Sequence, residues 1–340
     1  MRLKFKLMES IRRRIIQSVR SVTPGALKTS WWLVKIMFLV TFIITVLKYL
    51  GVISWISVYL TPFFSKFGLP GEASLAYVSG FFVNCYSAIA VITTLNMDVR
   101  SITILAVMVL CAHNIPMETA VQKKTGTSAI RMILVRTLSS LFLGWFLHKI
   151  MPGETMLGIA RAVETQSREF WPMMGTWAID TVKIAVPMVL LVYSLTVIQR
   201  LLAEFGVIRY IANFLRPVMI FFGLPPKTAF LWIVANTLGL AYGAAVMIDE
   251  VDAGKISGED VDLLNHHISI SHSNLEDLLL FTAIGGLIPW MLFSRWAVSL
   301  FWVWERRLER MIMSRMKRDY KKSRGEMTRT FDPLHPMQVR

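Results

Sequence analysis

The sequence predicts an all-α integral membrane protein that contains two inverted repeats. Three observations support this fold class: an apolar composition, long apolar segments and an internal repeat. Of the 340 residues, 54% are hydrophobic and 17% are charged, and the mean hydropathy is +0.53. A soluble domain of this composition would expose an extensive apolar surface, so the composition favours a membrane protein.

The two ends of the chain carry most of its net charge of +15. Residues 1–30 are expected to form a basic amphipathic segment, with a surface helix over Leu3–Val19 that the Thr-Pro-Gly sequence at 23–25 ends. The tail, 305–340, holds eleven Lys/Arg against five acids. Basic segments beside apolar spans stay in the cytoplasm and are attracted to anionic headgroups. We therefore expect a multi-pass protein of the inner, or cytoplasmic, membrane with both termini cytoplasmic, and no nucleic-acid partner.

Six segments are apolar and long enough to cross a bilayer, which takes about 20 residues. They are 31–50, 72–93, 130–150, 179–200, 227–248 and 279–303. Two further stretches, 101–117 and 262–277, are too short or too polar to face lipid. If both dip into the membrane and return, the basic loops lie inside and the acidic loop at 249–260 lies outside, as the positive-inside rule favours. Each is therefore expected to be a re-entrant or broken helix surrounded by protein or a water-filled cavity.

An internal repeat relates the two halves of the chain. Residues 47–70 align with 202–225 at an offset of 155, with eleven identical pairs that end in Phe-Gly-Leu-Pro; chance gives roughly two. The similarity resumes at an offset of 159, where His113 matches His272 and Glu118 matches Asp277. Each half has three spans, an odd number, so the second half is expected to be inverted. Inverted repeats are typical of secondary transporters, whose binding site lies between the repeats.

The predicted organisation follows from these segments. It comprises a cytoplasmic segment (1–30), a first membrane repeat (31–150), a connecting loop (151–178), a second membrane repeat (179–304) and a cytoplasmic tail (305–340). Each repeat is expected to hold three spans, an interfacial helix and a re-entrant or broken helix.

The strongest candidates for a binding site lie in the two polar breaks. Ionisable groups inside a membrane are costly and usually face a cavity or a pathway, and broken helices expose backbone groups that can bind a polar solute. The alternative is that each histidine pairs with its own carboxylate and stabilises the turn. The predicted substrate- or ion-binding residues are His113, Asn114, Glu118, Ser271, His272, Ser273, Asn274, Glu276 and Asp277, with Asn84 and Asn236 as secondary candidates.

Metal binding and catalysis have weaker signals. His267, His272 and Cys111 are candidate metal ligands, but no spacing among them defines a coordination geometry. Arg136 and Arg295 match by repeat and are expected near span ends, where they snorkel or pair. No catalytic residue and no resident cofactor is predicted, because the sequence contains no Walker, GxSxG or HExxH motif. Coupling to Na⁺ or H⁺ and a divalent metal are left open.

Three motifs resemble the nucleoside-recognition, or Gate-domain, membrane proteins. They are Phe-Gly-Leu-Pro-Gly-Glu-Ala at 67–73, Cys-Ala-His-Asn-Ile-Pro-Met-Glu at 111–118 and Ser-His-Ser-Asn-Leu-Glu-Asp at 271–277. That superfamily includes bacterial spore-maturation membrane proteins, and it is related to the membrane domains of ferrous-iron transporters and to concentrative nucleoside transporters. The resemblance covers about 30–304 and implies a helical membrane protein with paired re-entrant elements.

The residues and the resemblance together predict a transporter or permease for a small polar solute. The resemblance implies a nucleoside or a related metabolite. Two alternatives are divalent metal transport and a non-transporting membrane module that assembles partners or handles lipids. Enzymatic activity is not expected, and homo-oligomer formation is left open.

Overall fold

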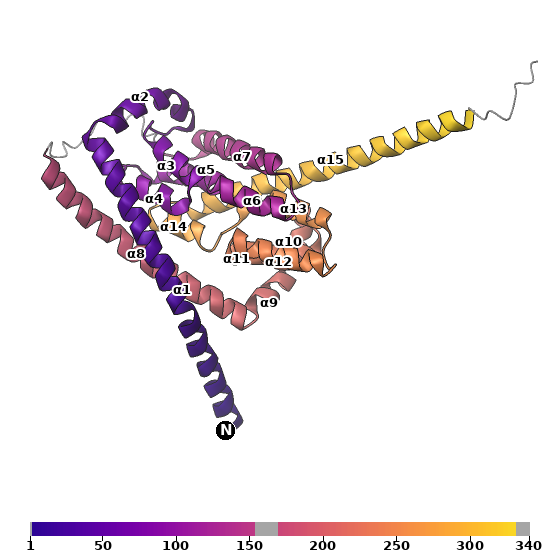
Figure 1. Ribbon diagram of the computed structural model, residues 1–340, viewed down its shortest axis with the longest axis horizontal. Coiled ribbons are helices and arrows are strands. Elements are labelled where there is room, and N and C mark those ends of the chain that lie inside the picture. The colour runs from indigo at the N-terminus through magenta and orange to yellow at the C-terminus, as the bar shows by residue number, and fades with distance from the viewer. Residues whose placement is uncertain (1, 154–168, 331–340) are drawn as a thin grey trace, which may run out of the picture.

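The computed structural model describes residues 2–153 and 169–330, and every regular element within these ranges is a helix (Figure 1). The all-α prediction is therefore confirmed for this part of the chain. Residues 154–168 of the predicted connecting loop and 331–340 of the predicted tail lie outside the described ranges. We call 2–153 the first half and 169–330 the second half.

Four helical stretches are long and apolar enough to cross a membrane: Met8–Tyr49, Val99–Lys124, Ala129–Ile150 and Phe170–Glu204. Two of them contain the predicted spans 130–150 and 179–200, and a third covers 31–50 except for its last residue. The fourth contains 101–117, and it is broken into α5 (Val99–Ala112) and α6 (Ile115–Lys124). At 26 residues it has the length of a full crossing rather than of a shallow dip.

α1 (Arg2–Tyr49) and α8 (Phe170–Glu204) pack antiparallel along one side of the molecule (Figure 1). Arg14 Nε meets Glu204 Oε1 at 3.0 Å, and at the opposite end of the pair the rings of Tyr49 and Phe170 are 5.2 Å apart. The predicted helix end at Thr23-Pro24-Gly25 is wrong, because α1 continues through Pro24. Thr23 is held there by Tyr193 of α8, with the two hydroxyl oxygens 3.1 Å apart.

The predicted continuous spans 72–93 and 227–248 are each two helices. The first comprises α3 (Ala73–Phe82) and α4 (Cys85–Ile92), and the second comprises α11 (Ala229–Leu238) and α12 (Leu240–Asp252). In each pair the helices pack closely on each other: a Cβ on Gly80 would lie 3.1 Å from that of Ala88, and a Cβ on Gly243 3.2 Å from that of Ala235. These segments are therefore helical hairpins, a difference that hydropathy cannot detect because both arms are apolar.

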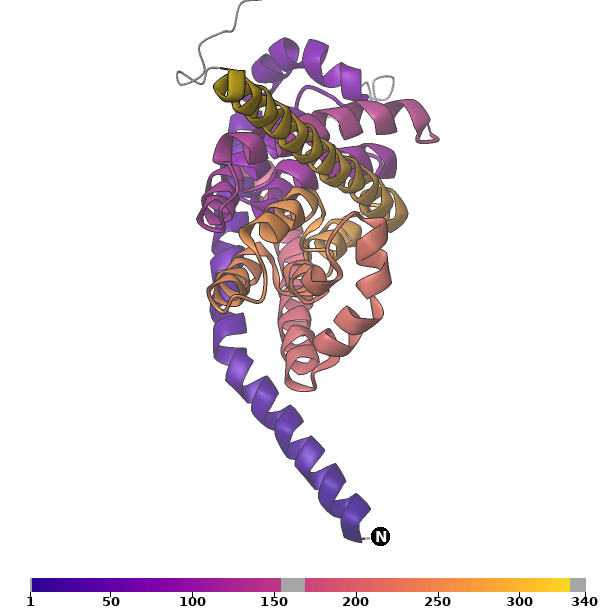
Figure 2. The same cartoon turned by 90° about the vertical axis from the view of Figure 1, so that its right-hand side faces the viewer.

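The remaining helices follow the repeat. The first half contains α2 (Val52–Phe64), η1 (Ser65–Phe67) and α7 (Ala129–Ile150), and the second contains α9 (Val207–Phe214), α10 (Arg216–Phe221), η3 (Pro226–Thr228), α13 (Gly258–Ser271), α14 (Asp277–Ala283) and α15 (Ile288–Thr330). The predicted span 279–303 is interrupted between α14 and α15. The N-terminal part of α1 and the C-terminal part of α15 project from the helical body (Figures 1 and 2).

Contacts place the acidic loop beside the basic segments, which corrects the predicted topology. Lys227 Nζ lies 2.5 Å from Asp260 Oδ2, and Arg310 of α15 donates to the Glu259 carbonyl oxygen at 3.1 Å. The sequence predicts the loop at 249–260 on the opposite side of the membrane from Lys227 and from the tail. Instead the loop lies beside both, because α11 and α12 form a hairpin that brings the chain back to the end of the bundle where α11 begins.

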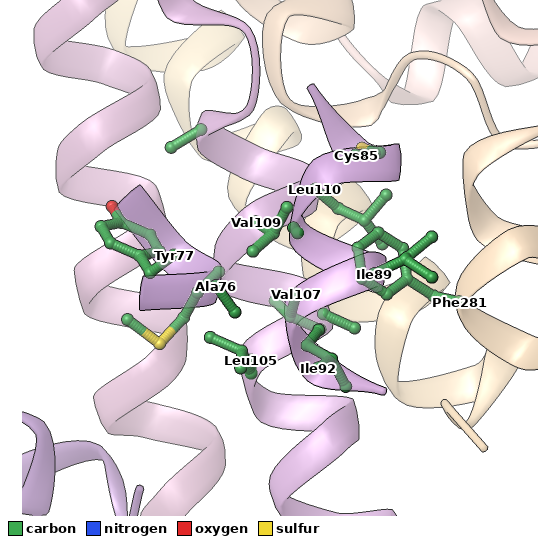
Figure 3. Close-up of a cluster of buried hydrophobic side chains, with 14 of the residues drawn as sticks. Ala76, Tyr77, Cys85, Ile89, Ile92, Leu105, Val107, Val109, Leu110 and Phe281 are labelled. Carbon is green, nitrogen blue, oxygen red and sulfur yellow. The ribbon is translucent and has the colours of Figure 1, made fainter. Parts of the chain in front are cut away.

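α5 lies in the centre of the molecule. Its nine consecutive residues from Ile104 to Ala112 expose 1% or less of their surface. Side chains of α4, such as Cys85 and Ile89, surround it in the core together with Phe281 of α14 (Figure 3). A helix that is apolar all round is stable when protein covers every face. Such a helix fixes the position of the polar break at its C-terminal end.

Candidate functional site

Both polar breaks have the same backbone geometry. Asn114 and Ser273 are the two non-glycine residues of the described ranges with positive φ, 48° and 58°. Asn114 N donates to the Gly80 carbonyl oxygen at 2.9 Å, and Ser273 N donates to that of Ala235 at 3.2 Å. Gly80 and Ala235 are equivalent in the repeat, so each hairpin holds the break of the next helix in its own half.

Two buried arginines bind the helix ends at these breaks. Arg136 Nε donates to the Cys111 carbonyl oxygen at 2.9 Å, and Arg136 Nη2 to that of His113 at 2.6 Å. Arg295 Nη1 makes the equivalent bonds to Ile270 and His272 at 3.2 and 3.3 Å. A cation at a helix C-terminus satisfies free carbonyls and complements the helix dipole. Both arginines are fully buried, so the expected snorkelling is wrong. The expected pairing is found for Arg136, which meets Glu118, whereas Arg295 binds carbonyl oxygens and Asn274.

His113, Glu118, His272 and Asp277 converge between the two halves, and we call these four residues the central cluster. His113 Nε2 lies 3.1 Å from Glu118 Oε1 and 3.5 Å from Asp277 Oδ2. His272 Nε2 lies 3.2 Å from Glu118 Oε1. All four residues are buried, with at most 8% of the surface of each exposed. The histidines therefore contact carboxylates of the opposite half, which self-pairing within each motif does not explain.

The ring orientation of each histidine is set by its own helix. His272 Nδ1 lies 2.7 Å from the Ile268 carbonyl oxygen, and His113 Nδ1 lies 3.1 Å from that of Leu110. A carbonyl oxygen can only accept, so Nδ1 carries the proton in both rings. Each Nε2 is therefore directed at the cluster, with a free lone pair when the ring is neutral.

The first half has Glu118 where the second half has Asp277, and this difference makes the cluster asymmetric. Glu118 reaches Arg136, with Oε2 and Nη1 2.7 Å apart. Asp277 is one methylene shorter, and Arg295 Nη2 instead donates to Asn274 Oδ1 at 2.6 Å. Within the described ranges, His113 is the one ion-pair partner of the Asp277 carboxylate. The Asp277 side of the cluster is thus less neutralised than the Glu118 side.

The other predicted site residues support the breaks around the cluster. Asn274 Nδ2 donates to Asn236 Oδ1 at 2.5 Å, which joins the second break to its hairpin. Asn84 caps α4 by accepting from Ser87 N at 2.9 Å. Glu276 accepts a hydrogen bond from Tyr86 of the first half. Ser271 Oγ lies 2.7 Å from His267 Nδ1, away from the central cluster.

The predicted metal ligands His267 and Cys111 do not join the cluster. His267 Nδ1 accepts from Trp232 Nε1 at 3.2 Å in the core of the second half. Cys111 contributes its carbonyl oxygen to Arg136. The thiol that does approach is that of Cys85, whose Sγ lies within 4.8 Å of ligand atoms of His113 and Asp277. The sequence offered no signal for Cys85 beyond its place one residue after Asn84.

Comparison with known proteins places these residues in a family. The family model described as Gate, nucleoside recognition, matches residues 30–145, which include His113, Glu118 and Arg136. The uncharacterized membrane protein YvoD of Bacillus subtilis is 31% identical over 261 residues, which cover 76% of this chain and 84% of YvoD. The chain belongs to the Gate family of membrane proteins. The resemblance read from the motifs is thereby confirmed, and no solved structure matches this Gate protein.

Proposed function

We propose that this Gate protein is a membrane transporter or permease that carries a small polar solute through the central cluster. The observation that carries the proposal is the contact of His113 and His272 with carboxylates of the opposite half, inside a buried region. Charged groups there are costly, and they usually face the path of a solute or an ion. The Gate family is associated with transport, which supports the same function.

We further propose that the halves are inverted repeats, with both termini in the cytoplasm and the basic ends on anionic lipid. The α3–α4 hairpin and the α11–α12 hairpin are attached at opposite ends of the bundle. Lys48 Nζ of α1 donates to the Thr94 carbonyl oxygen just after α4 at 3.1 Å, whereas Lys227 before α11 pairs with Asp260 near Arg310 of the tail. Hairpins that enter from opposite faces and meet broken helices are the arrangement expected of inverted transporter repeats.

A hydroxyl-lined cavity lies at the end of α4 that is remote from the cluster. It has a volume of about 260 Å³ and lies between α1, α8 and the end of α4, with Thr41, Thr94, Thr181, Lys48 and Asp180 in its wall. The eight residues of α4 separate it from Cys85, a distance of about 12 Å at 1.5 Å per residue. Hydroxyl, ammonium and carboxylate groups suit a polar solute, and a nucleoside or related metabolite is the class that the family description suggests.

Uptake by reconstituted protein tests this proposal. Proteoliposomes are loaded with purified wild-type chain and assayed with a panel of labelled nucleosides and nucleobases, with and without a Na⁺ or H⁺ gradient. We expect uptake of at least one solute, and its loss in His272→Ala and Asp277→Ala. His148→Ala, at a histidine outside the cluster, is the matched control and retains uptake. Unchanged uptake in the two cluster variants would refute the site, and no uptake by the wild type would favour a non-transporting module.

A further inference from the structure

We propose that His113, Glu118 and His272 bind a divalent ion of a first-row transition metal. The inference deepens the proposed function, because it names a cation for the same site. Only the role of the ion in transport depends on the proposed function. Metal binding itself is argued from the positions of the ligand atoms.

The first argument is that the cluster brings hydrogen-bond acceptors together without donors between them. Both Nδ1 atoms face backbone carbonyls, so both Nε2 atoms present lone pairs when the rings are neutral. Glu118 Oε1 lies within 3.2 Å of both of them. Three acceptors so close repel one another unless a proton on one of the rings or a metal ion lies among them. The burial of the cluster makes that repulsion strong.

The second argument is the spacing. Metal–nitrogen and metal–oxygen bonds of about 2.0–2.1 Å in a tetrahedral site place neighbouring ligand atoms about 3.3 Å apart. The observed separations are 3.1 Å from His113 to Glu118, 3.2 Å from His272 to Glu118 and 3.5 Å from His113 to Asp277. An ion fits among the ligand atoms of His113, Glu118 and His272 with little movement of the side chains, whereas Asp277 belongs to a separate group around His113.

The third argument is the support behind each ligand. Histidines that bind metals usually donate the other ring N–H to a carbonyl or carboxylate, which both histidines do here. Arg136 Nη1 holds the second oxygen of Glu118 at 2.7 Å, which leaves Oε1 free to bind. Imidazole with carboxylate suits Zn²⁺, Fe²⁺ or Co²⁺, whereas Ca²⁺ and Mg²⁺ prefer sites built from oxygen.

Titration of the purified full-length chain in detergent tests the site. After chelator treatment we expect one Co²⁺ or Zn²⁺ per chain, with the visible absorption of four-coordinate Co²⁺. His113→Ala and His272→Ala should weaken binding by more than about 100-fold, because changes to outer partners of a ligand already cost 10–100-fold. His267→Asn is the matched control, a buried histidine of the same helix, and should bind normally.

X-ray absorption on the zinc-loaded wild-type chain keeps the proposal testable if the variants fail to fold. We expect two imidazoles in the first shell. A stoichiometry near zero, a first shell without imidazole, or loss of metal in His267→Asn with retention in His272→Ala would overturn the inference. The uptake assay separates it from the proposed function: cluster-dependent solute uptake by a chain that binds no metal would refute the metal site alone. A metal-binding chain that takes up no solute would refute transport alone.

Discussion

One buried arginine binds each of the two polar breaks, and the two arginines differ in that only Arg136 pairs with a carboxylate. Arg136 pairs with Glu118, whereas Arg295 binds Asn274 and carbonyl oxygens. The repeat predicted that the two arginines are equivalent, and the structure confirms it. Their full burial could not be predicted from sequence, because hydropathy places them near span ends and only tertiary packing shows that α5 and α13 end against them.

Removal of Arg136 should destabilise the fold strongly. Arg136→Met leaves Glu118 buried without its guanidinium, and breaking a buried pair in this way costs about 3–5 kcal/mol. Thermal unfolding of the purified chain in detergent measures the effect. The double variant Arg136→Met/Glu118→Gln should recover part of the loss. An equal loss in the double variant would show that the ion pair is not the cause.

At Ser273 the left-handed backbone itself can be tested. Its φ of 58° disfavours side chains branched at Cβ, so Ser273→Val should lower the free energy of unfolding by about 1–2 kcal/mol. Ser273→Gly should be close to neutral, because glycine adopts this φ freely but loses more entropy on folding. Denaturation of the three proteins in parallel measures the effect. Equal losses in both variants would point to the lost hydroxyl instead.

At the scale of elements, the polar breaks were predictable and the hairpins were not. His113 and Asn114 end an apolar run, so the sequence predicted where α5 ends. The polar stretch 262–277 predicted a break but not the residue at which α13 ends. The hairpins turn at Asn84 and Gly239. Apolar residues flank both positions, so the hydropathy does not change at either turn. A sliding average over about 20 residues cannot see a reversal made by one residue.

Gly239 should be essential to the α11–α12 turn for a conformational reason alone. Its φ of 85° and ψ of 166° lie in a region that essentially only glycine occupies, and nothing lies within 4 Å of the position of an added Cβ. Gly239→Ala should therefore cost about 1–3 kcal/mol of stability through backbone strain. Gly258→Ala is the matched control, because that position is equally open and its φ is not positive. Equal thermal stability of the two variants would contradict this account.

The start of α13 should give a pH-dependent contribution to stability. Burial alone raises the pKa of Asp260, but hydrogen bonds from Lys227 and Ser257 outweigh it and hold the pKa below its ordinary value. The stabilisation is therefore present above the unfolded pKa of about 3.9, and it is lost as the pH falls through the folded pKa. Asp260→Asn should cost about 1 kcal/mol at neutral pH, as expected for a capping residue. The melting temperatures of variant and wild type should converge at low pH, and a constant difference would refute this origin.

At the scale of the whole molecule, the two halves meet at the central cluster. The sequence predicted the repeat and the matched histidines, because identity at a fixed offset is visible in one chain. It did not predict which segments cross and which return. The positive-inside rule separated the acidic loop at 249–260 from Lys227 because 227–248 was taken as one span, whereas the α11–α12 hairpin brings the chain back beside Lys227.

The labelling of single cysteines from one side of the membrane tests most directly the claim that the two halves are inverted. Single cysteines are placed at Asn96 beyond α4, at Asp252 at the end of α12 and at Ser314 on α15, all exposed positions, while native Cys85 and Cys111 are buried. A membrane-impermeant maleimide applied to intact cells should label Asn96→Cys alone, and permeabilised cells should show all three. Labelling of Asp252→Cys in intact cells would place the second hairpin on the same face as the first and would contradict the inverted arrangement.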